Sequence, residues 1–217
     1  MKRLRNKYTK DERVRFISHL DLLRVFQRAL RRADIKVAFS QGFNPHPKIS
    51  FGPALVVGAT TEADYMDVDL EEEISAEEFK KRMNKVLPPG IKIVESYEVD
   101  VNDPLSKRIK AAEYILKVNF KKNCKDVENK LEEFIKRDAI ELEKETKSGK
   151  KMIDLKFYLL DLKALEIKEG YLKLYIKLKL EEGVPNPLNL LKALNEYLGD
   201  VFEMDSYKLH RKNIILE

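Results

Sequence analysis

The chain has 217 residues, 43% of them hydrophobic, which is enough for one large domain or two small ones with separate apolar cores. The single cysteine excludes an internal disulfide and an iron–sulfur cluster bound by this chain alone. Because there is no apolar run of about 18 residues, we expect a soluble cytoplasmic protein without a membrane partner. The formal net charge of +5 makes polyanions the natural class of partner.

The positive charge is concentrated in the amino-terminal quarter. Residues 1–52 contain 13 Lys or Arg against 4 Asp or Glu, whereas the remaining residues contain 29 against 33. Residues 61–103 are acidic, with 13 acidic against 5 basic side chains. We therefore expect any polyanion to bind near the amino terminus, unless the acidic segment covers that surface.

The first elements in the chain are weak strands over residues 2–8 and 13–16, followed by a helix over residues 19–33. Ser18 and Asp21 form a capping-box pattern that predicts the helix start. Apolar side chains recur on one side of this helix, and we expect that side to face the core. Asp21 lies near the opposite side and will neutralise part of its charge. The basic side chains of that opposite side are Arg24, Arg28, Arg31 and Arg32.

Residues 40–53 form a loop that two prolines make stiff. Pro45 and Pro47 fix their own backbone angles and push Asn44 and His46 towards extended conformations. One interpretation is a pre-ordered ligand clamp beside the basic helix. The other is a plain connection whose prolines prevent strand pairing at a sheet edge.

Two stretches carry a resemblance to a known family. The runs FISHLDLLRVFQRALRRADI and AFSQGFNPHPKISFGPAL resemble the radical-SAM-linked protein family, a domain encoded beside or fused to cobalamin-binding radical SAM proteins. The resemblance is specific over about residues 13–70 and looser afterwards. It implies an accessory role beside a radical SAM partner, with nucleic-acid modification as its setting.

Two halves with the same order of elements are expected. Strands over 36–40, 49–55 and 64–70, a helix from Ser75 capped with Glu78, and a strand over 91–98 complete a β-α-β-β-α-β order. Residues 100–112 have no sustained pattern and predict a linker. The same order then recurs, with an extra extended segment between about Met152 and Leu165. We predict an α+β fold of two tandem ferredoxin-like units with antiparallel sheets, in domains 1–103 and 113–217; the alternative is one continuous α+β domain.

A strand over residues 171–180 has the clearest alternation in the chain. Its leucines and isoleucine share one face, and its polar face interleaves Lys with Tyr, which suits phosphate pairing and base stacking. An exposed sheet face protected from aggregation by lysines is the alternative interpretation. The residues of this secondary candidate surface are Tyr171, Lys173, Tyr175, Lys177 and Lys179.

Catalytic chemistry has only two candidate residues. His19 or His46 could act as a base in a metal-independent endoribonuclease or an RNA-modifying enzyme, with Lys48 stabilising charge. No spacing of His, Cys or acidic residues matches a metal site, and no cofactor is expected. We commit to no catalytic residue and favour a role other than an enzyme.

The interpretation preferred from the sequence is an RNA-binding or substrate-presenting accessory protein that works with a radical SAM protein. A protein-only adaptor is a further alternative, and it predicts indifference to nucleic acid. The expected contacts are mainly with phosphates, while Gln41, Asn44 and His46 read a base or position the partner. The residues of the predicted RNA surface are Arg13, Arg15, Arg24, Arg28, Arg31, Arg32, Gln41, Asn44, His46 and Lys48.

Overall fold

The computed structural model describes residues 2–122, 126–146, 149–180 and 186–217. By its internal contacts the chain divides into two compact units: unit 1 comprises residues 1–110 and 211–217, and unit 2 comprises residues 111–210. The last strand, β10 (Phe202–Leu216), therefore contributes residues to both units. Each unit combines helices with mostly antiparallel strands, which confirms the α+β class. That the units fold independently as domains stays a prediction.

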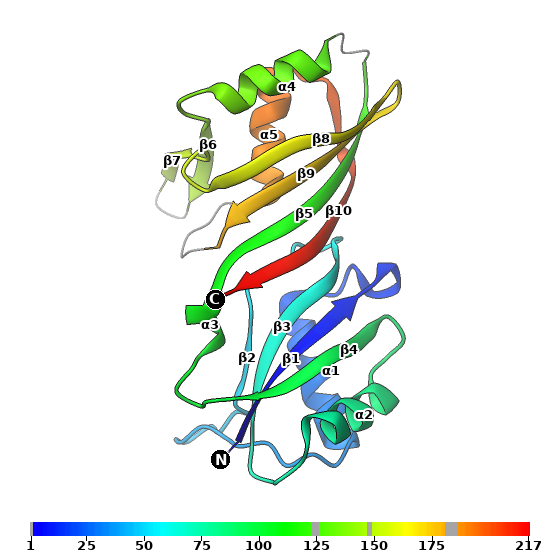
Figure 1. The fold of residues 1–217 in the computed structure, drawn as a ribbon, viewed down its shortest axis with the longest axis vertical. Coiled ribbons are helices and arrows are strands. Elements are labelled where there is room, and N and C mark those ends of the chain that lie inside the picture. Colours follow the sequence, from blue (N-terminus) through cyan, green and yellow to red (C-terminus); the bar gives the residue numbers. More distant parts are fainter. Residues whose placement is uncertain (1, 123–125, 147–148, 181–185) are drawn as a thin grey trace. The chain divides into compact units, whose positions relative to one another are not determined.

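Unit 1 is built on a sheet with β1 at its centre. β1 lies between β3 and β4, antiparallel to both, and β2 pairs antiparallel with β3 (Figure 1). The elements up to residue 99 are β1 (Lys2–Lys10), the 3-10 turn η1 (Glu12–Val14), α1 (His19–Arg32), β2 (Ile49–Phe51), β3 (Thr60–Leu70), α2 (Ala76–Val86) and β4 (Ile91–Val99).

Two predicted strands of unit 1 are wrong. The segment 13–16 does not form a strand because the Asp11 side chain accepts a hydrogen bond from the Arg13 amide and caps η1. The segment 36–40 is reduced to two isolated bridges, Val37 with Leu70 and Phe39 with Pro47. Both errors arise where a side chain or a proline competes with the regular strand ladder.

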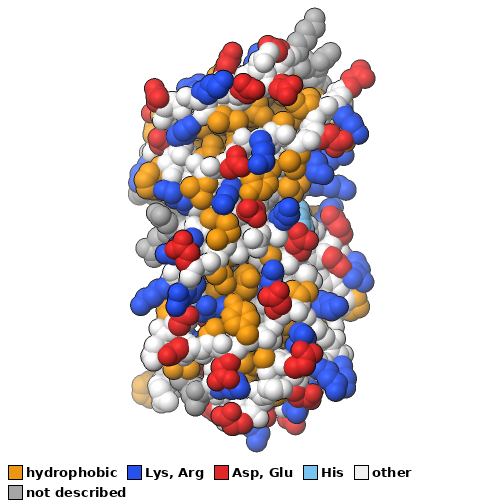
Figure 2. All heavy atoms as spheres, viewed as in Figure 1, with side chains coloured by type: hydrophobic (Ala, Val, Ile, Leu, Met, Phe, Trp, Pro, Cys, Tyr) orange, Lys and Arg blue, Asp and Glu red, His pale blue; other side chains and the backbone are white. Residues whose placement is uncertain are grey.

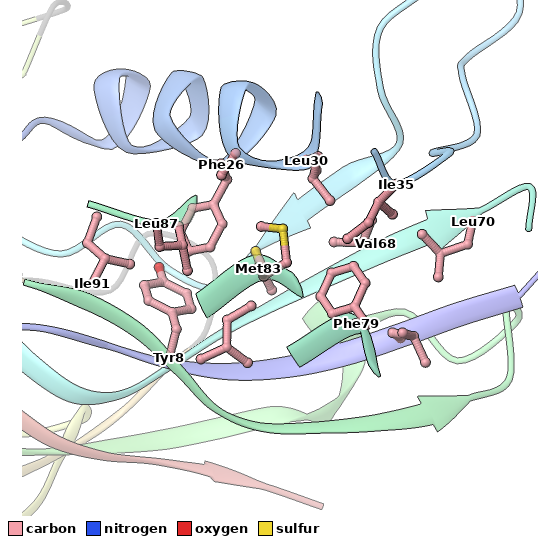
Figure 3. Close-up of a cluster of buried hydrophobic side chains, with 14 of the residues drawn as sticks. Tyr8, Phe26, Leu30, Ile35, Val68, Leu70, Phe79, Met83, Leu87 and Ile91 are labelled. Atoms are coloured by element: carbon pink, nitrogen blue, oxygen red, sulfur yellow. The ribbon is translucent and has the colours of Figure 1, made fainter. Parts of the chain in front are cut away.

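The hydrophobic core of unit 1 lies between its sheet and the helices α1 and α2 (Figure 3). Phe26 of α1 is fully buried, with its ring centroid 5.1 Å from that of Tyr8 and 5.6 Å from that of Phe51. α2 contributes Phe79 and Met83. Because the core fixes α1 along its apolar side, the basic side of α1 faces away from the sheet.

The opposite face of the unit 1 sheet carries charged side chains that are nevertheless buried. The register sets Arg3 opposite Asp69 and Arg5 opposite Asp67. Arg5 donates to both Asp67 carboxylate oxygens at 2.9 and 3.0 Å, and the two residues are 3% and 1% exposed. Asp67 and Asp69 of β3 thus lie in buried ion pairs with arginines of β1.

The predicted linker over residues 100–112 is part of unit 1 for most of its length. Arg3 and Arg5 donate to the carbonyl oxygens of Val101 and Asp103 at 2.8 Å each. The segment also contains the short helix α3 (Leu105–Arg108), whose Leu105 is buried. Residues 100–108 therefore cover the two arginines and shield them from water.

The strands of unit 2 form a run of antiparallel pairs and a separate hairpin. β9 lies between β5 and β8, antiparallel to both, and β5 also neighbours β10 (Figure 1). β6 and β7 form their own two-stranded sheet, so the extra segment expected between Met152 and Leu165 is divided between β7 and β8. The other elements of unit 2 are β5 (Ile109–Phe120), α4 (Val127–Lys136), β6 (Glu141–Thr146), β7 (Gly149–Asp154), β8 (Leu159–Lys168), β9 (Tyr171–Lys179) and α5 (Pro187–Tyr197).

The helices of unit 2 lie on one side of its sheet (Figure 1). α4 buries Leu131 and Phe134, and α5 buries Leu191 and Leu194. Asn186 caps α5 because its side chain accepts a hydrogen bond from the Leu188 amide at 2.8 Å. Across the described ranges of both units, no helix has the length and apolar character needed to span a membrane.

Candidate nucleic-acid interface

The helix α1 carries four of the predicted phosphate-binding residues, and its sequence sets its ends. The Ser18 hydroxyl accepts a hydrogen bond from the Asp21 amide at 3.2 Å, as the capping pattern predicts. At the other end, Asp34 has a φ of 52°, a left-handed conformation that stops the helix. All four arginines on the outer side are exposed, namely Arg24, Arg28, Arg31 and Arg32.

Two of these four guanidinium groups are already engaged. Arg24 pairs with Asp21 at 2.9 Å, which confirms that this aspartate neutralises part of the surface. Arg32 donates to the carbonyl oxygen of Val86, the last residue of α2, at 2.6 Å. Arg28 and Arg31 have no acceptor within the described ranges, so their charge is directed to solvent.

The acidic segment 61–103 reaches this outer side only through the Val86 carbonyl oxygen that accepts from Arg32, among the contacts of the described residues. The carboxylates of α2 pair with basic residues of the same helix, as Glu77 does with Lys80 and Glu78 with Arg82. Within the part of the chain that the structure describes, no carboxylate of that segment forms an ion pair with Arg28 or Arg31. The alternative in which the basic side of α1 is purely structural loses its main support.

Arg13 and Arg15 differ from the helix arginines because each pairs with a nearby carboxylate. Arg13 binds Asp11 through its side chain, with a nitrogen-to-oxygen distance of 2.5 Å. Arg15 pairs with Glu12 at 2.5 Å and also lies 4.7 Å from the ring centroid of Phe16. The Arg13 pair is exposed and Arg15 is half-buried, and ion pairs of this kind near the surface contribute little stability.

The proline loop is a narrow hairpin with a fixed base. The Ser40 amide donates to the His46 carbonyl at 2.9 Å, and the His46 amide donates to the Ser40 hydroxyl at 3.0 Å. The base is attached to β3, since the Asp69 amide donates to the Lys48 carbonyl at 3.0 Å. Lys48 is half-buried at this base. The exposed tip residues are Gln41, Gly42, Phe43, Asn44, Pro45 and His46.

The two histidines lie in different surroundings. His19 is half-buried, and its ring packs edge-on against Phe51 with a centroid distance of 5.6 Å. His46 is exposed on the proline loop. Over the described residues no hydrogen bond or ring contact joins the two histidines.

The secondary surface on β9 has the predicted alternation, with its apolar side chains buried and its Lys and Tyr side chains partly exposed. Its aromatic groups, however, already have partners. The Lys117 ammonium lies 3.6 Å from the ring centroid of Tyr171, and the Tyr175 hydroxyl donates to Glu113 at 2.6 Å. Figure 2 shows acidic and basic groups interspersed over this side of β5, β8 and β9. The arrangement is typical of a mixed-charge sheet surface.

Tyr175 gives a testable pH dependence. Burial, together with the Glu113 carboxylate, raises the pKa of Tyr175 to about 12 from 10.0. The folded state therefore keeps this proton between pH 10 and about 12 while the unfolded state loses it, so the free energy of unfolding falls as the pH rises through that window. Tyr175→Phe should flatten this fall in urea unfolding followed by circular dichroism. Equal pH dependence in the two proteins would contradict the assignment.

The structure also brings together charged residues that the sequence did not single out. Lys10, Asp64 and Arg211 are 3%, 5% and 3% exposed. The Arg211 guanidinium donates to Asp64 Oδ1 at 2.8 Å, and the Thr61 hydroxyl donates to the same oxygen at 3.0 Å. We call Lys10, Asp64 and Arg211 the buried charge cluster. No group of three His, Cys, Asp or Glu side chains that could hold a metal ion occurs in the described ranges.

Two solved structures resemble the chain over most of its length. The crystal structure of a Cbf5-Nop10-Gar1 complex matches with a TM-score of 0.54, at 11% identity over 96% of this chain and 48% of that chain. The structure of an H/ACA RNP bound to a substrate RNA containing 2'-deoxyuridine matches with a TM-score of 0.51, at 10% identity over 94% and 46%. The chain thus spans about half the length of both, and these identities establish similarity of fold alone.

Comparison of sequences assigns the family. No curated protein matches the chain. A family model described as "Uncharacterized protein conserved in bacteria (DUF2344)" matches residues 3–189, which include both runs that carry the resemblance noted above. The match extends through all of the helix α1, the proline loop and most of unit 2, and the chain therefore belongs to this bacterial family.

Proposed function

We propose that this protein binds RNA through the outer side of α1 and acts as an accessory or substrate-presenting protein. The observation that carries the proposal is the exposure of Arg28 and Arg31 without an acceptor in the described ranges. Guanidinium groups form paired hydrogen bonds with phosphate oxygens, and a phosphate would supply the acceptors that these two lack. Arg24 and Arg32 extend the track on either side.

The proline loop would give the second part of the interface. Its tip is exposed, and its base is fixed to β3 by backbone hydrogen bonds, so little conformational entropy remains to be lost on binding. Asn44, Gln41 and His46 offer donors and acceptors for the edge of an unpaired base. Phe43, which is fully exposed, would provide a ring for stacking.

The structural comparisons support RNA as the polyanion. The two neighbours described above belong to complexes, and one of these was solved with a substrate RNA. They resemble this chain in fold only. The proposal that the chain itself contacts RNA therefore depends on the arginines of α1, and the neighbours add a precedent for the fold in such assemblies.

We also propose a ferredoxin-like topology for each unit, a radical SAM protein as the partner and a cytoplasmic location. The strand orders β4-β1-β3-β2 and β10-β5-β9-β8 support two ferredoxin-like units, since each follows a β-α-β-β-α-β order. The resemblance over residues 13–70 supports a radical SAM protein as the partner. The abundance of ion pairs and the single cysteine favour a cytoplasmic setting. A metal-independent endoribonuclease or RNA-modifying enzyme that uses His19 or His46 stays the alternative to this function.

Charge reversal at Arg28 tests the RNA contact. Arg28→Glu should weaken binding of a labelled single-stranded RNA about tenfold at low salt, because it removes one phosphate contact and adds repulsion. The dependence of log Kd on log salt concentration should also become shallower by about 0.7. Fluorescence anisotropy over a salt series measures both quantities.

Lys136→Glu is the matched control, since it makes the same charge change on an exposed position of α4. It should leave the RNA affinity within about twofold, because it leaves every arginine of α1 in place. Equal affinity of the wild type and Arg28→Glu would refute the interface. A wild type without RNA affinity that forms a stable complex with the radical SAM partner would identify a protein-only adaptor.

A further inference from the structure

In the buried charge cluster of unit 1, the Lys10 ammonium forms no ion pair within the described residues, whereas Asp64 pairs with Arg211. All three residues are at least 95% shielded from solvent. Asp64 already accepts hydrogen bonds from Arg211 and Thr61. The Lys10 ammonium donates instead to the carbonyl oxygens of Arg15 and Ile17, at 3.1 and 3.4 Å. Since a buried charge without a counter-ion is costly, an anion that reached Lys10 would stabilise the cluster.

Burial affects the ionisation of Lys10 in the expected direction. It lowers the pKa of the Lys10 ammonium, with Arg211 acting in the same sense and Asp64 opposing both. A bound anion would reverse this shift, because an opposite charge within a few ångströms favours the charged form of an amine. The neighbouring groups among the described residues thus compensate the positive charge of the Lys10 ammonium only in part.

A pocket opens directly beside Lys10. Its lining includes Lys10, Ser18, His19 and Asp64, with Ile17 and Leu22 among the apolar walls. It measures about 330 Å³ with its open mouth included, and its enclosed part measures about 10 Å³. The enclosed part therefore has room for one water-sized group, such as a single oxygen of a larger oxyanion, while the mouth holds the remainder.

The start of α1 lies at the same pocket. Ser18 is the cap and His19 the first residue of this 14-residue helix. Amide groups of a first helical turn have no partner inside the helix and carry partial positive charge. His19 adds an imidazole that is half-buried at the pocket wall. The pocket thus combines a buried ammonium, an imidazole and a helix start around one small space.

We propose that this pocket is a binding site for a phosphate-type oxyanion, with Lys10 as its principal ligand and His19 as a second donor. One phosphate oxygen occupies the enclosed part against Lys10, and the others remain at the mouth near His19 and the start of α1. The site lies on the core side of α1, whereas Arg28 and Arg31 lie on its outer side. The proposal therefore does not rest on RNA binding by the arginines.

Inorganic phosphate tests the site in the full chain. Unfolding is measured over increasing phosphate at constant ionic strength, with chloride as the balancing ion, and the apparent Kd follows from the rise in stability. Lys10→Met should weaken phosphate at least tenfold, since it removes a charge-assisted hydrogen bond while keeping the length of the side chain. His19→Gln should weaken phosphate by a smaller factor, and it provides a test if Lys10→Met fails to fold.

Lys85→Met is the matched control for this titration, because it removes a cation from an exposed position of α2 in the same unit, outside both proposed sites. Its response to phosphate should equal that of the wild type. Equal responses in the wild type, Lys10→Met and His19→Gln would overturn the proposal and indicate general stabilisation by an excluded salt. A wild type that does not respond to phosphate would also overturn it.

A second pair of probes identifies the source of the phosphate. The affinities for a 5'-phosphorylated RNA and for the same RNA with a 5'-hydroxyl group are compared in the wild type and in Lys10→Met. Preference for the phosphorylated end only in the wild type assigns an RNA terminus to the pocket. Absence of this preference, together with a phosphate response that requires Lys10, assigns free phosphate. The titration contains no RNA, so failure of the RNA proposal would leave its result unchanged.

Discussion

Replacing Asp67 with alanine is expected to lower the free energy of unfolding by about 3–5 kcal/mol. Arg5 is bound to Asp67 by two hydrogen bonds of 2.9 and 3.0 Å, and both side chains are almost fully buried. Removal of the carboxylate leaves the guanidinium shielded from water with only the carboxylate of Asp103, 3.6 Å away, as a nearby counter-charge. Urea unfolding of the full chain, followed by circular dichroism, measures the loss.

Glu98→Ala is the appropriate comparison for this variant. Glu98 also pairs across the sheet, with Lys2 at 2.8 Å, but its side chain is 63% exposed. Its removal should change the free energy of unfolding by no more than about 0.5 kcal/mol, because water replaces the lost partner. If Asp67→Ala cost as little as Glu98→Ala, Arg5 would have to be reached by solvent, and residues 100–108 could not be its cover.

Phe26→Ala should be similarly damaging, with an expected loss of about 3–5 kcal/mol. Phe26 is completely buried and contacts the rings of both Tyr8 and Phe51, so alanine would leave a cavity bounded by two strands. The same side chain holds α1 against the sheet. If RNA binding requires the arginines of α1 to stay aligned, the variant should also have a lower RNA affinity. Fluorescence anisotropy with labelled RNA, in the absence of urea, measures this affinity.

Leu20→Ala on the same helix separates burial from helix propensity. Leu20 is 63% exposed, so its truncation removes few contacts, and alanine is an equally good helix former. We expect a change below about 0.5 kcal/mol. A loss for Leu20→Ala comparable to that of Phe26→Ala would mean that Leu20 is covered by something other than this chain.

Local features of the fold could be predicted because they depend on neighbouring residues. The helix starts at Ser18 and Ser75 follow from hydroxyl groups that accept hydrogen bonds within the first turn. The strand β9 could be predicted because its apolar and polar residues alternate strictly, and in a strand this alternation places all the apolar side chains on one face of the sheet. The partial neutralisation of α1 by Asp21 is of the same kind, since the two partners are three residues apart.

Distant pairings could not be predicted in this way. Asp64 and Arg211 are separated by 147 positions, and nothing local to either residue indicates that they meet. The contact of Arg32 could not be predicted either, because its acceptor is the carbonyl oxygen of Val86 at the end of α2 and not a carboxylate. One long-range signal was present: the basic residues at alternate positions of β1 match the acidic residues at alternate positions of β3, which could have indicated pairing of these two strands.

The discontinuity of unit 1 has a consequence for biosynthesis. The buried carboxylate of Asp64 obtains its guanidinium partner from a segment that the ribosome makes after the whole of unit 2. Residues 1–110 thus emerge from the exit tunnel well before Arg211 is available to them. This part of unit 1 must therefore persist without its buried Asp64–Arg211 ion pair throughout the synthesis of unit 2.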